Sequence, residues 1–80
     1  MITTSLEDIH PPVKIDPEKV KRLREERVLS QRDLAKRARI SQGTVWRIEN
    51  GFAEVHPRTI RRLAAALDVE PGELMIREVR

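Results

Sequence analysis

Residues 41–50, Ser-Gln-Gly-Thr-Val-Trp-Arg-Ile-Glu-Asn, contain the side chains whose types and spacing could do chemistry. In a helix, Val45 and Ile48 share one face, and the opposite face carries amide, aromatic and guanidinium groups. The outward residues are Gln42, Gly43, Trp46, Arg47 and Asn50. A polar and basic face of this kind suits insertion into the major groove of DNA, which admits one helix and displays hydrogen-bonding base edges. The segment therefore predicts recognition of nucleic acid.

Two short helices must position that face. Ser30-Gln-Arg-Asp33 has the spacing of a capping box, which predicts that a helix of about eight residues starts there. Ser41 is the next N-cap, and Asn50-Gly51 ends the second helix because glycine readily takes the left-handed conformation that follows a helix. Residues 30–51 therefore predict a helix-turn-helix with a recognition helix at about residues 42–50.

Three further helices are expected around this motif. Asp16-Pro17-Glu18 starts a first helix, because aspartate caps and proline suits the first helical position. His56-Pro57 starts a fourth helix, and residues 68–75 contain a short fifth. The fold class is therefore all-α, a compact five-helix bundle.

The N-terminal segment has a different character. Residues 1–15 contain Pro11-Pro12 and lack helical periodicity, so they predict a short extended arm ahead of a domain at residues 16–80. A short strand could form in the arm around Ile2–Leu6 or Val13–Ile15.

Composition excludes several classes of function. The 80 residues include no cysteine, so disulfides and thiolate metal sites are excluded, and His10 and His56 lie too far apart to suggest a metal site. No nucleophile–base arrangement or glycine-rich phosphate loop is present, so we expect no enzymatic activity and no cofactor. Apolar runs are too short to span a membrane, and no signal peptide is evident, which predicts a cytoplasmic protein.

Charge is concentrated in the middle of the chain. Residues 17–50 hold ten basic and five acidic side chains, a net charge of +5, whereas residues 1–16 and 68–80 each carry −2. Arginine outnumbers lysine twelve to four, which favours multidentate contacts with phosphates and base edges. This distribution is compatible with DNA binding by the middle of the chain.

Longer segments resemble a known family. Leu23-Arg-Glu-Glu-Arg-Val-Leu-Ser-Gln-Arg-Asp-Leu-Ala and Ile40-Ser-Gln-Gly-Thr-Val-Trp-Arg-Ile-Glu-Asn-Gly resemble the Cro/phage-repressor type of helix-turn-helix regulator, the XRE-like family. The resemblance continues through Pro57-Arg-Thr-Ile-Arg-Arg-Leu-Ala-Ala-Ala-Leu-Asp-Val-Glu-Pro-Gly-Glu-Leu and covers about residues 17–75. It implies a lambda-repressor-like DNA-binding fold.

The resemblance also implies roles for single residues. Gln42 and Arg47 match positions that read base edges, for which adenine and guanine are the natural partners. The full set of implied base contacts is Gln42, Gly43, Trp46 and Arg47, and the implied phosphate contacts are Gln31, Ser41, Thr44, Asn50 and Arg58. Trp46 could instead cover the core beside Phe52. Arg24 and Glu49 resemble an ion pair that ties the first helix to the third.

Two positions depart from the family's usual pattern. Arg39 stands where the family commonly has glycine, and a left-handed conformation there would cost arginine about 1 kcal/mol. Glu54 lies in the loop after the recognition helix, where its charge would repel phosphates.

These observations predict a sequence-specific transcriptional regulator, a repressor that binds an inverted-repeat operator in double-stranded DNA as a homodimer. Apolar residues near the C-terminus could form the dimer surface, namely Leu74, Met75, Ile76 and Val79. One alternative is an antitoxin that regulates its own operon and binds a toxin through residues 1–16 or 68–80. Another is a protein-interaction adaptor that has lost DNA binding.

Overall fold

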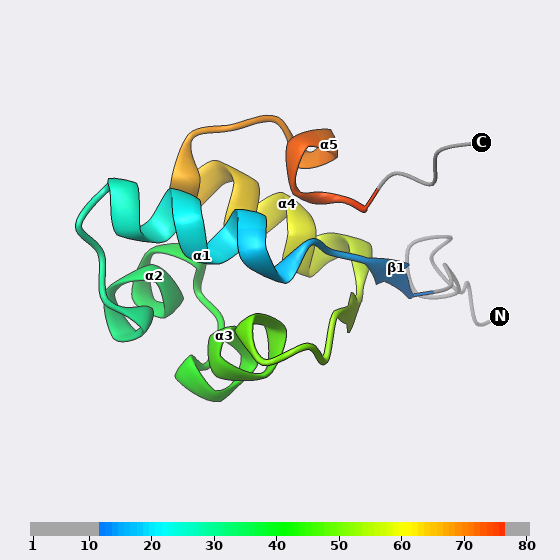
Figure 1. Cartoon of the computed structure of the whole chain (residues 1–80), viewed down its shortest axis with the longest axis horizontal. Helices are drawn as coiled ribbons and strands as arrows, with labels where there is room; N and C mark the ends of the chain where they lie inside the picture. Colours follow the sequence, from blue (N-terminus) through cyan, green and yellow to red (C-terminus); the bar gives the residue numbers. More distant parts are fainter. Residues whose placement is uncertain (1–11, 77–80) are drawn as a thin grey trace, which may run out of the picture.

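The computed structural model of this chain describes residues 12–76. The possible strand at Ile2–Leu6 and most of the predicted N-terminal arm lie outside the described residues, as does Val79. The described part is mostly helical (Figure 1). Its elements are β1 (Val13–Lys14), α1 (Pro17–Glu26), α2 (Gln31–Ala38), α3 (Gln42–Glu49), β2 (Glu54–Val55), α4 (Pro57–Leu67) and α5 (Pro71–Leu74). The five expected helices are therefore confirmed within residues 12–76, and a small sheet accompanies them.

Local capping explains where the first three helices begin. The Asp16 carboxylate accepts the backbone N–H groups of Glu18 and Lys19 at 3.1 and 3.3 Å, respectively. Ser30 and Asp33 form the predicted capping box, with bonds of 2.9 and 3.0 Å. The Ser41 hydroxyl accepts the backbone N–H of Thr44 at 3.0 Å. Each cap satisfies amides that the first turn of a helix leaves without a partner.

Helix ends depend on left-handed residues. Four described residues have positive φ: Val28 at 55°, Arg39 at 59°, Asp68 at 59° and Gly51 at 100°. Gly51 follows α3 as predicted, and its neighbour Phe52 donates its N–H to the Arg47 carbonyl at 2.8 Å. Arg39 is left-handed, so it carries the cost of about 1 kcal/mol that this conformation has for arginine. Valine at position 28 is a more costly occupant because its β-branched side chain crowds the backbone there.

The core is aliphatic and lies between the helices. Its largest fully buried side chains are Ile15, Leu34, Ile48, Leu63, Leu67, Leu74, Val20 and Val45. Ala35 and Ala38 of α2 are also buried, which allows this short helix to pack closely against both α3 and α4. Neither aromatic residue belongs to the core, because Trp46 is 51% and Phe52 is 64% exposed.

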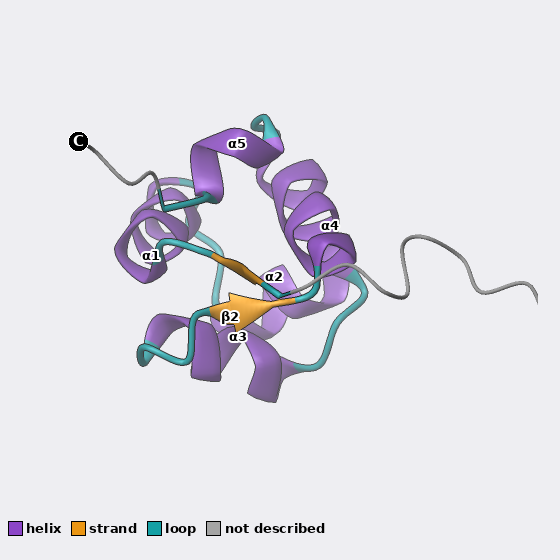
Figure 2. Ribbon diagram, turned by 90° about the vertical axis from the view of Figure 1, so that its right-hand side faces the viewer, coloured by secondary structure: helices purple, strands orange, loops and turns teal. Residues whose placement is uncertain are grey.

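The small sheet joins the start of the described chain to its middle and end. β1 pairs antiparallel with β2, so that Val13 lies opposite Val55 and Lys14 lies opposite Glu54 (Figure 2). On the other side of this segment, Ile15 forms a bridge with Met75. The short strand expected at Val13–Ile15 is present as β1, whereas the sequence did not predict β2.

Leu74, which the sequence suggested for a dimer surface, lies instead in the core. Leu74 is fully buried, and its carbonyl accepts the Asp16 N–H at 2.7 Å, so its side chain cannot form a dimer surface as the sequence suggested. Met75 and Ile76 remain 38% and 45% exposed. The physical reason is that α5 packs on α4, which turns its one long apolar side chain inward.

Candidate nucleic-acid interface

Helix α3 presents the predicted reading face to solvent. Val45 and Ile48 are 0% and 1% exposed, and they fix the inner face of the helix in the core. The four candidate base-contact residues all lie on the exposed side: Gln42, Gly43, Trp46 and Arg47. The structure therefore places these four residues on the exposed side of one helix. Figure 1 shows that this helix, α3, lies beside α2.

Gly43 leaves room on this face. A Cβ atom built at Gly43 would meet only the Ser41 hydroxyl, at 3.9 Å, which is ordinary contact. The backbone conformation of Gly43 is helical and does not require glycine. Nothing in the protein itself therefore explains glycine at this position.

A polar cluster holds the far end of α3. The Glu49 carboxylate accepts hydrogen bonds from Arg24 Nε at 2.7 Å and from Arg24 Nη2 at 2.9 Å. Gln31 Nε2 also donates to Glu49, at 3.0 Å, and Arg24 Nη1 donates to the Leu29 carbonyl at 2.8 Å. The predicted Arg24–Glu49 pair is thus confirmed, and it joins α1, α2 and α3 at one point.

The side chains of this ion pair are largely shielded from solvent, which changes its energetics. The Arg24 and Glu49 side chains are only 11% and 3% exposed. Burial by itself raises the pKa of Glu49, but hydrogen bonds from Arg24 and Gln31, with the Arg24 charge, hold that pKa below its ordinary value. The hydrogen bond to Glu49 in turn raises the pKa of Arg24. Both groups are therefore charged over the physiological pH range.

The candidate phosphate-contact residues are already engaged in local hydrogen bonds. The Ser41 and Thr44 hydroxyls lie 2.8 Å apart, and Asn50 Nδ2 donates to the Trp46 carbonyl at 2.8 Å. The Gln31 amide is oriented by Glu49. These hydrogen bonds fix polar side chains at both ends of α3. The contacts of these side chains with phosphates remain predictions.

A groove runs between α3 and the start of α4. Thr44, Arg47 and Ile48 line it on the α3 side, and His56 and Thr59 line it on the other. Three residues of the connecting segment complete the lining: Phe52, Glu54 and Val55. His56 is the N-cap of α4, in agreement with the helix start that the sequence predicts at His56-Pro57. Arg58, the remaining candidate phosphate contact, is an exposed neighbour of His56 in the first turn of α4.

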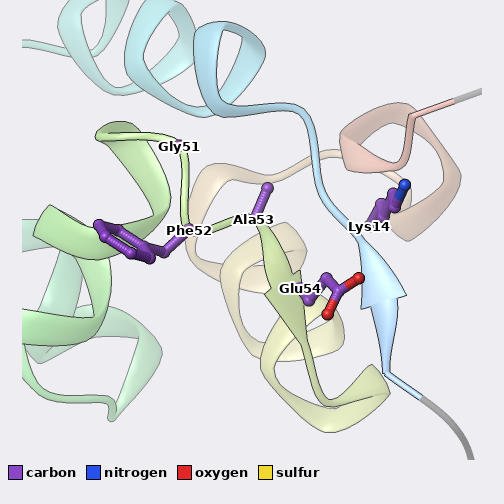
Figure 3. Close-up of a pocket in the computed structure, with 5 residues that line it drawn as sticks. All are labelled: Lys14, Gly51, Phe52, Ala53 and Glu54. Atoms are coloured by element: carbon purple, nitrogen blue, oxygen red, sulfur yellow. The ribbon is translucent and has the colours of Figure 1, made fainter.

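The loop after α3 is shaped by the small sheet. Figure 3 shows the Phe52 ring directed toward α3, whereas Glu54 lies on the side of the sheet where Lys14 lies. Glu54 is opposite Lys14 in the register of β1 and β2, and cross-strand pairs of opposite charge are favourable. The carboxylate that the sequence suggested would repel phosphates therefore has a cation across the strand pair.

Two other kinds of site find no support in the described residues. Residues 12–76 contain no group of three histidine, cysteine, aspartate or glutamate side chains placed to hold a metal ion. None of the helices described here is long and apolar enough to cross a membrane.

Comparison with known proteins places this geometry in a family. The helix-turn-helix domain family matches residues 18–75. The restriction-modification controller protein C.AhdI from Aeromonas hydrophila is 36% identical, with a TM-score of 0.70 over 74% of this chain and 89% of that chain. No curated protein matches the chain.

Two larger proteins contain a similar unit. An HTH_3 family transcriptional regulator from Vibrio cholerae has a TM-score of 0.68 at 24% identity, over 72% of this chain and 33% of that chain, which shows the fold. The Y98F mutant of hydroxyethylphosphonate dioxygenase has a TM-score of 0.71 at 27% identity, over 84% of this chain but only 14% of the enzyme. The chain therefore belongs to the helix-turn-helix domain family and, as its sequence predicts, to the XRE-like DNA-binding transcriptional regulators.

Proposed function

We propose that this protein is a sequence-specific repressor that binds an inverted-repeat operator as a homodimer in the cytoplasm, without catalytic activity or a cofactor. The observation that carries the proposal is the exposed face of α3, where Gln42 and Arg47 project from a helix whose other face is fixed in the core. A rigid helix with an amide and a guanidinium group on its outer face fits the donor and acceptor pattern of the major groove.

The four proposed base-contacting residues would each make a different kind of contact. Gln42 pairs with adenine and Arg47 with guanine, each through two hydrogen bonds. Gly43 lets the DNA approach the backbone closely, which its open surroundings support. Trp46 is half exposed and offers an apolar surface to a neighbouring base. Sequence preference would therefore arise from four positions on two turns of one helix.

The proposed phosphate contacts surround this face. Gln31, Ser41, Thr44, Asn50 and Arg58 set the orientation of the helix on the duplex without reading sequence. Gln31 is the best prepared of them, because its amide is held by the buried Glu49 carboxylate. A side chain whose orientation is already fixed loses less conformational entropy when it binds.

Dimerisation follows from the small size of the reading face. One short recognition helix contacts only a few base pairs, and two-fold symmetry doubles the site over half-sites one helical turn apart. Met75 and Ile76 are exposed apolar side chains on the surface that remains available for self-association.

Selection of bound sequences from a random duplex pool tests the proposal. We expect an inverted repeat with half-sites about one helical turn apart, bound by two copies of the chain. Affinities for this consensus and for a scrambled duplex are then measured at two salt concentrations. Equal affinity for both duplexes, lost steeply with salt, would leave only phosphate contacts and would contradict a sequence-specific regulator.

Arg47→Ala tests the reading face directly. We expect a loss of about 1–3 kcal/mol on the consensus, together with relaxed preference at one base pair. Arg22→Ala is the matched control, because Arg22 is an exposed arginine on α1 and both variants lose one positive charge. Equal weakening of Arg47→Ala on all duplexes would assign Arg47 to a phosphate instead.

The likeness to C.AhdI favours a narrower second candidate. C.AhdI is a restriction-modification controller protein, and 36% identity over 89% of that chain supports the same role for this chain. In that case the selected consensus occurs upstream of neighbouring methyltransferase and endonuclease genes. Its absence from such a promoter would remove this candidate and leave the general regulator.

A further inference from the structure

An apolar groove lies where β1, α4 and α5 meet, away from the recognition helix. Ile60 is 2% exposed and Met75 is 38% exposed, so the groove reaches from the core to the surface. Arg61 carries a charge, and the other residues that line the groove are apolar. The described residues that line it are Val13, Pro57, Ile60, Arg61, Pro71 and Met75. A groove with this lining suits an apolar side chain that has acidic neighbours.

The sequence just before β1 has this composition. Residues 6–10, Leu-Glu-Asp-Ile-His, are called the acidic segment here. Glu7 and Asp8 are opposite in charge to Arg61, and Ile9 is the apolar residue next to them. Opposite charges across a contact favour the matching partner over others. The acidic segment therefore complements both the apolar lining and the one charge of the groove.

The acidic segment is also attached close to the groove. Val13 belongs to the lining, and Ile9 precedes it by four residues, which span at most about 14 Å. Such a short connection gives the segment an effective concentration on the order of millimolar. A separate molecule at micromolar concentration would have to bind far more tightly to occupy the same groove.

A second copy of the chain suits this groove less well. A two-fold contact brings the same surface of both copies face to face. If that contact were centred on the groove, the two Arg61 guanidinium groups would approach each other. Like charges across a contact are unfavourable, so the charge of the groove favours the acidic segment over a second copy.

We propose that the groove binds the acidic segment of its own chain, with the Ile9 side chain against the apolar lining and with Glu7 and Asp8 beside Arg61. The inference does not rest on the proposed DNA binding. Bound in this way, the segment shields Met75 from a second copy. Ile76 does not line the groove and stays available for self-association.

A spin label next to the acidic segment tests the inference in the full-length chain. The chain contains no cysteine, so Ser5→Cys takes a single nitroxide label, which broadens the amide NMR signals of residues near it. We expect the signals of Ile60 and Arg61 to be lost and that of Glu54 to persist. Glu54 is the reference because it lies opposite Lys14 in the sheet and outside the groove. A segment that is only tethered to β1 would broaden both sides alike.

Two matched pairs of variants identify the residues responsible. Ile9→Asp should restore the lost signals, whereas Ile2→Asp makes the same substitution outside the acidic segment and should leave them broadened. Arg61→Glu should restore the Ile60 signal, because it reverses the charge that the segment meets. Arg62→Glu changes the exposed neighbour on α4, which does not line the groove, and should restore nothing. Signals from the rest of the domain show whether each variant is folded.

A mixed sample identifies the chain that supplies the segment. Spin-labelled chain without isotope is combined with isotope-labelled chain without cysteine, and we expect all signals of the second chain to persist. Loss of the Ile60 and Arg61 signals in this mixture would show that a second copy fills the groove, which overturns the inference. Equal broadening of Ile60 and Glu54 in the singly labelled chain, or unchanged broadening in Ile9→Asp, would show that the segment does not bind the groove and would also overturn it.

Discussion

Replacing Arg24 with methionine tests how much of the stability of this fold depends on the ion pair behind the recognition helix. Methionine keeps an unbranched apolar chain but removes the guanidinium. The Glu49 side chain, 3% exposed, would then retain, among residues 12–76, only the Gln31 amide at 3.0 Å as a hydrogen-bond partner. The Leu29 carbonyl would also lose the bond that it accepts from Arg24.

The expected cost follows from this loss of partners. Removing one member of a buried ion pair typically costs about 3–5 kcal/mol, because the other charge stays buried without compensation. In a domain of 80 residues, 1 kcal/mol corresponds to about 4–8 °C in melting temperature. Arg24→Met should therefore melt at least about 12 °C below the wild type, as measured by circular dichroism and supported by urea denaturation.

A matched control and a double variant complete the test. Arg22→Met makes the same substitution at an exposed pair, where Arg22 and Glu26 lie 3.9 Å apart, and should cost less than about 1 kcal/mol. Combining Arg24→Met with Glu49→Met removes both charges and should recover most of the loss. A drop of less than about 4 °C in Arg24→Met, or a double variant as unstable as the single, would refute the reasoning.

Three further changes have defined outcomes. The unfolding free energy should fall as the pH drops below the ordinary glutamate pKa of 4.5, because the pKa of Glu49 is lowered in the folded chain and the unfolded chain then binds more protons. The Arg24→Met, Glu49→Met double variant lacks this group, so urea titrations should show that its stability depends less steeply on pH in this range. Val28→Gly should raise the melting temperature by several degrees, because Val28 is left-handed at φ 55° and its side chain, 89% exposed, contributes little packing that would be lost. A lower melting temperature would contradict backbone strain at this position. Gly43→Ala should stabilise the fold by about 1 kcal/mol while weakening binding to the consensus duplex; unchanged affinity would exclude a close backbone approach.

Local signals in the sequence predicted the helices well. Asp16, Ser30 and Ser41 cap helices through hydrogen bonds to residues two or three positions away, and such short-range pairs can be read from spacing alone. The outer face of α3 followed from the same logic, because Val45 and Ile48 fix which side is buried. For the candidate site, the sequence thus predicted a helix and its exposed residues, whereas their roles in binding remain predictions.

Long-range pairing was the part that the sequence did not reveal. β2 exists because Glu54 and Val55 meet residues some forty positions earlier, and two-residue strands have no periodicity to detect. The burial of Leu74 is also a long-range effect, since α5 packs on α4 and the Leu74 carbonyl accepts the N–H of Asp16 from the start of the described chain. The left-handed Val28 was also missed, because a left-handed position after a helix usually carries glycine.

The polar cluster at Glu49 explains how so small a core can orient a recognition helix. Helix α3 contributes only two buried apolar residues, Val45 and Ile48, which fix its inward face but would allow it to slide or tilt along its neighbours. Hydrogen bonds are directional, and Glu49 accepts three of them from α1 and α2 at 2.7 to 3.0 Å. An apolar pair of similar volume could match the stability of the ion pair without that directionality. The charged pair is therefore best understood as fixing the position of α3, and with it the spacing between Arg47 and the groups at the start of α4 that would contact the DNA backbone.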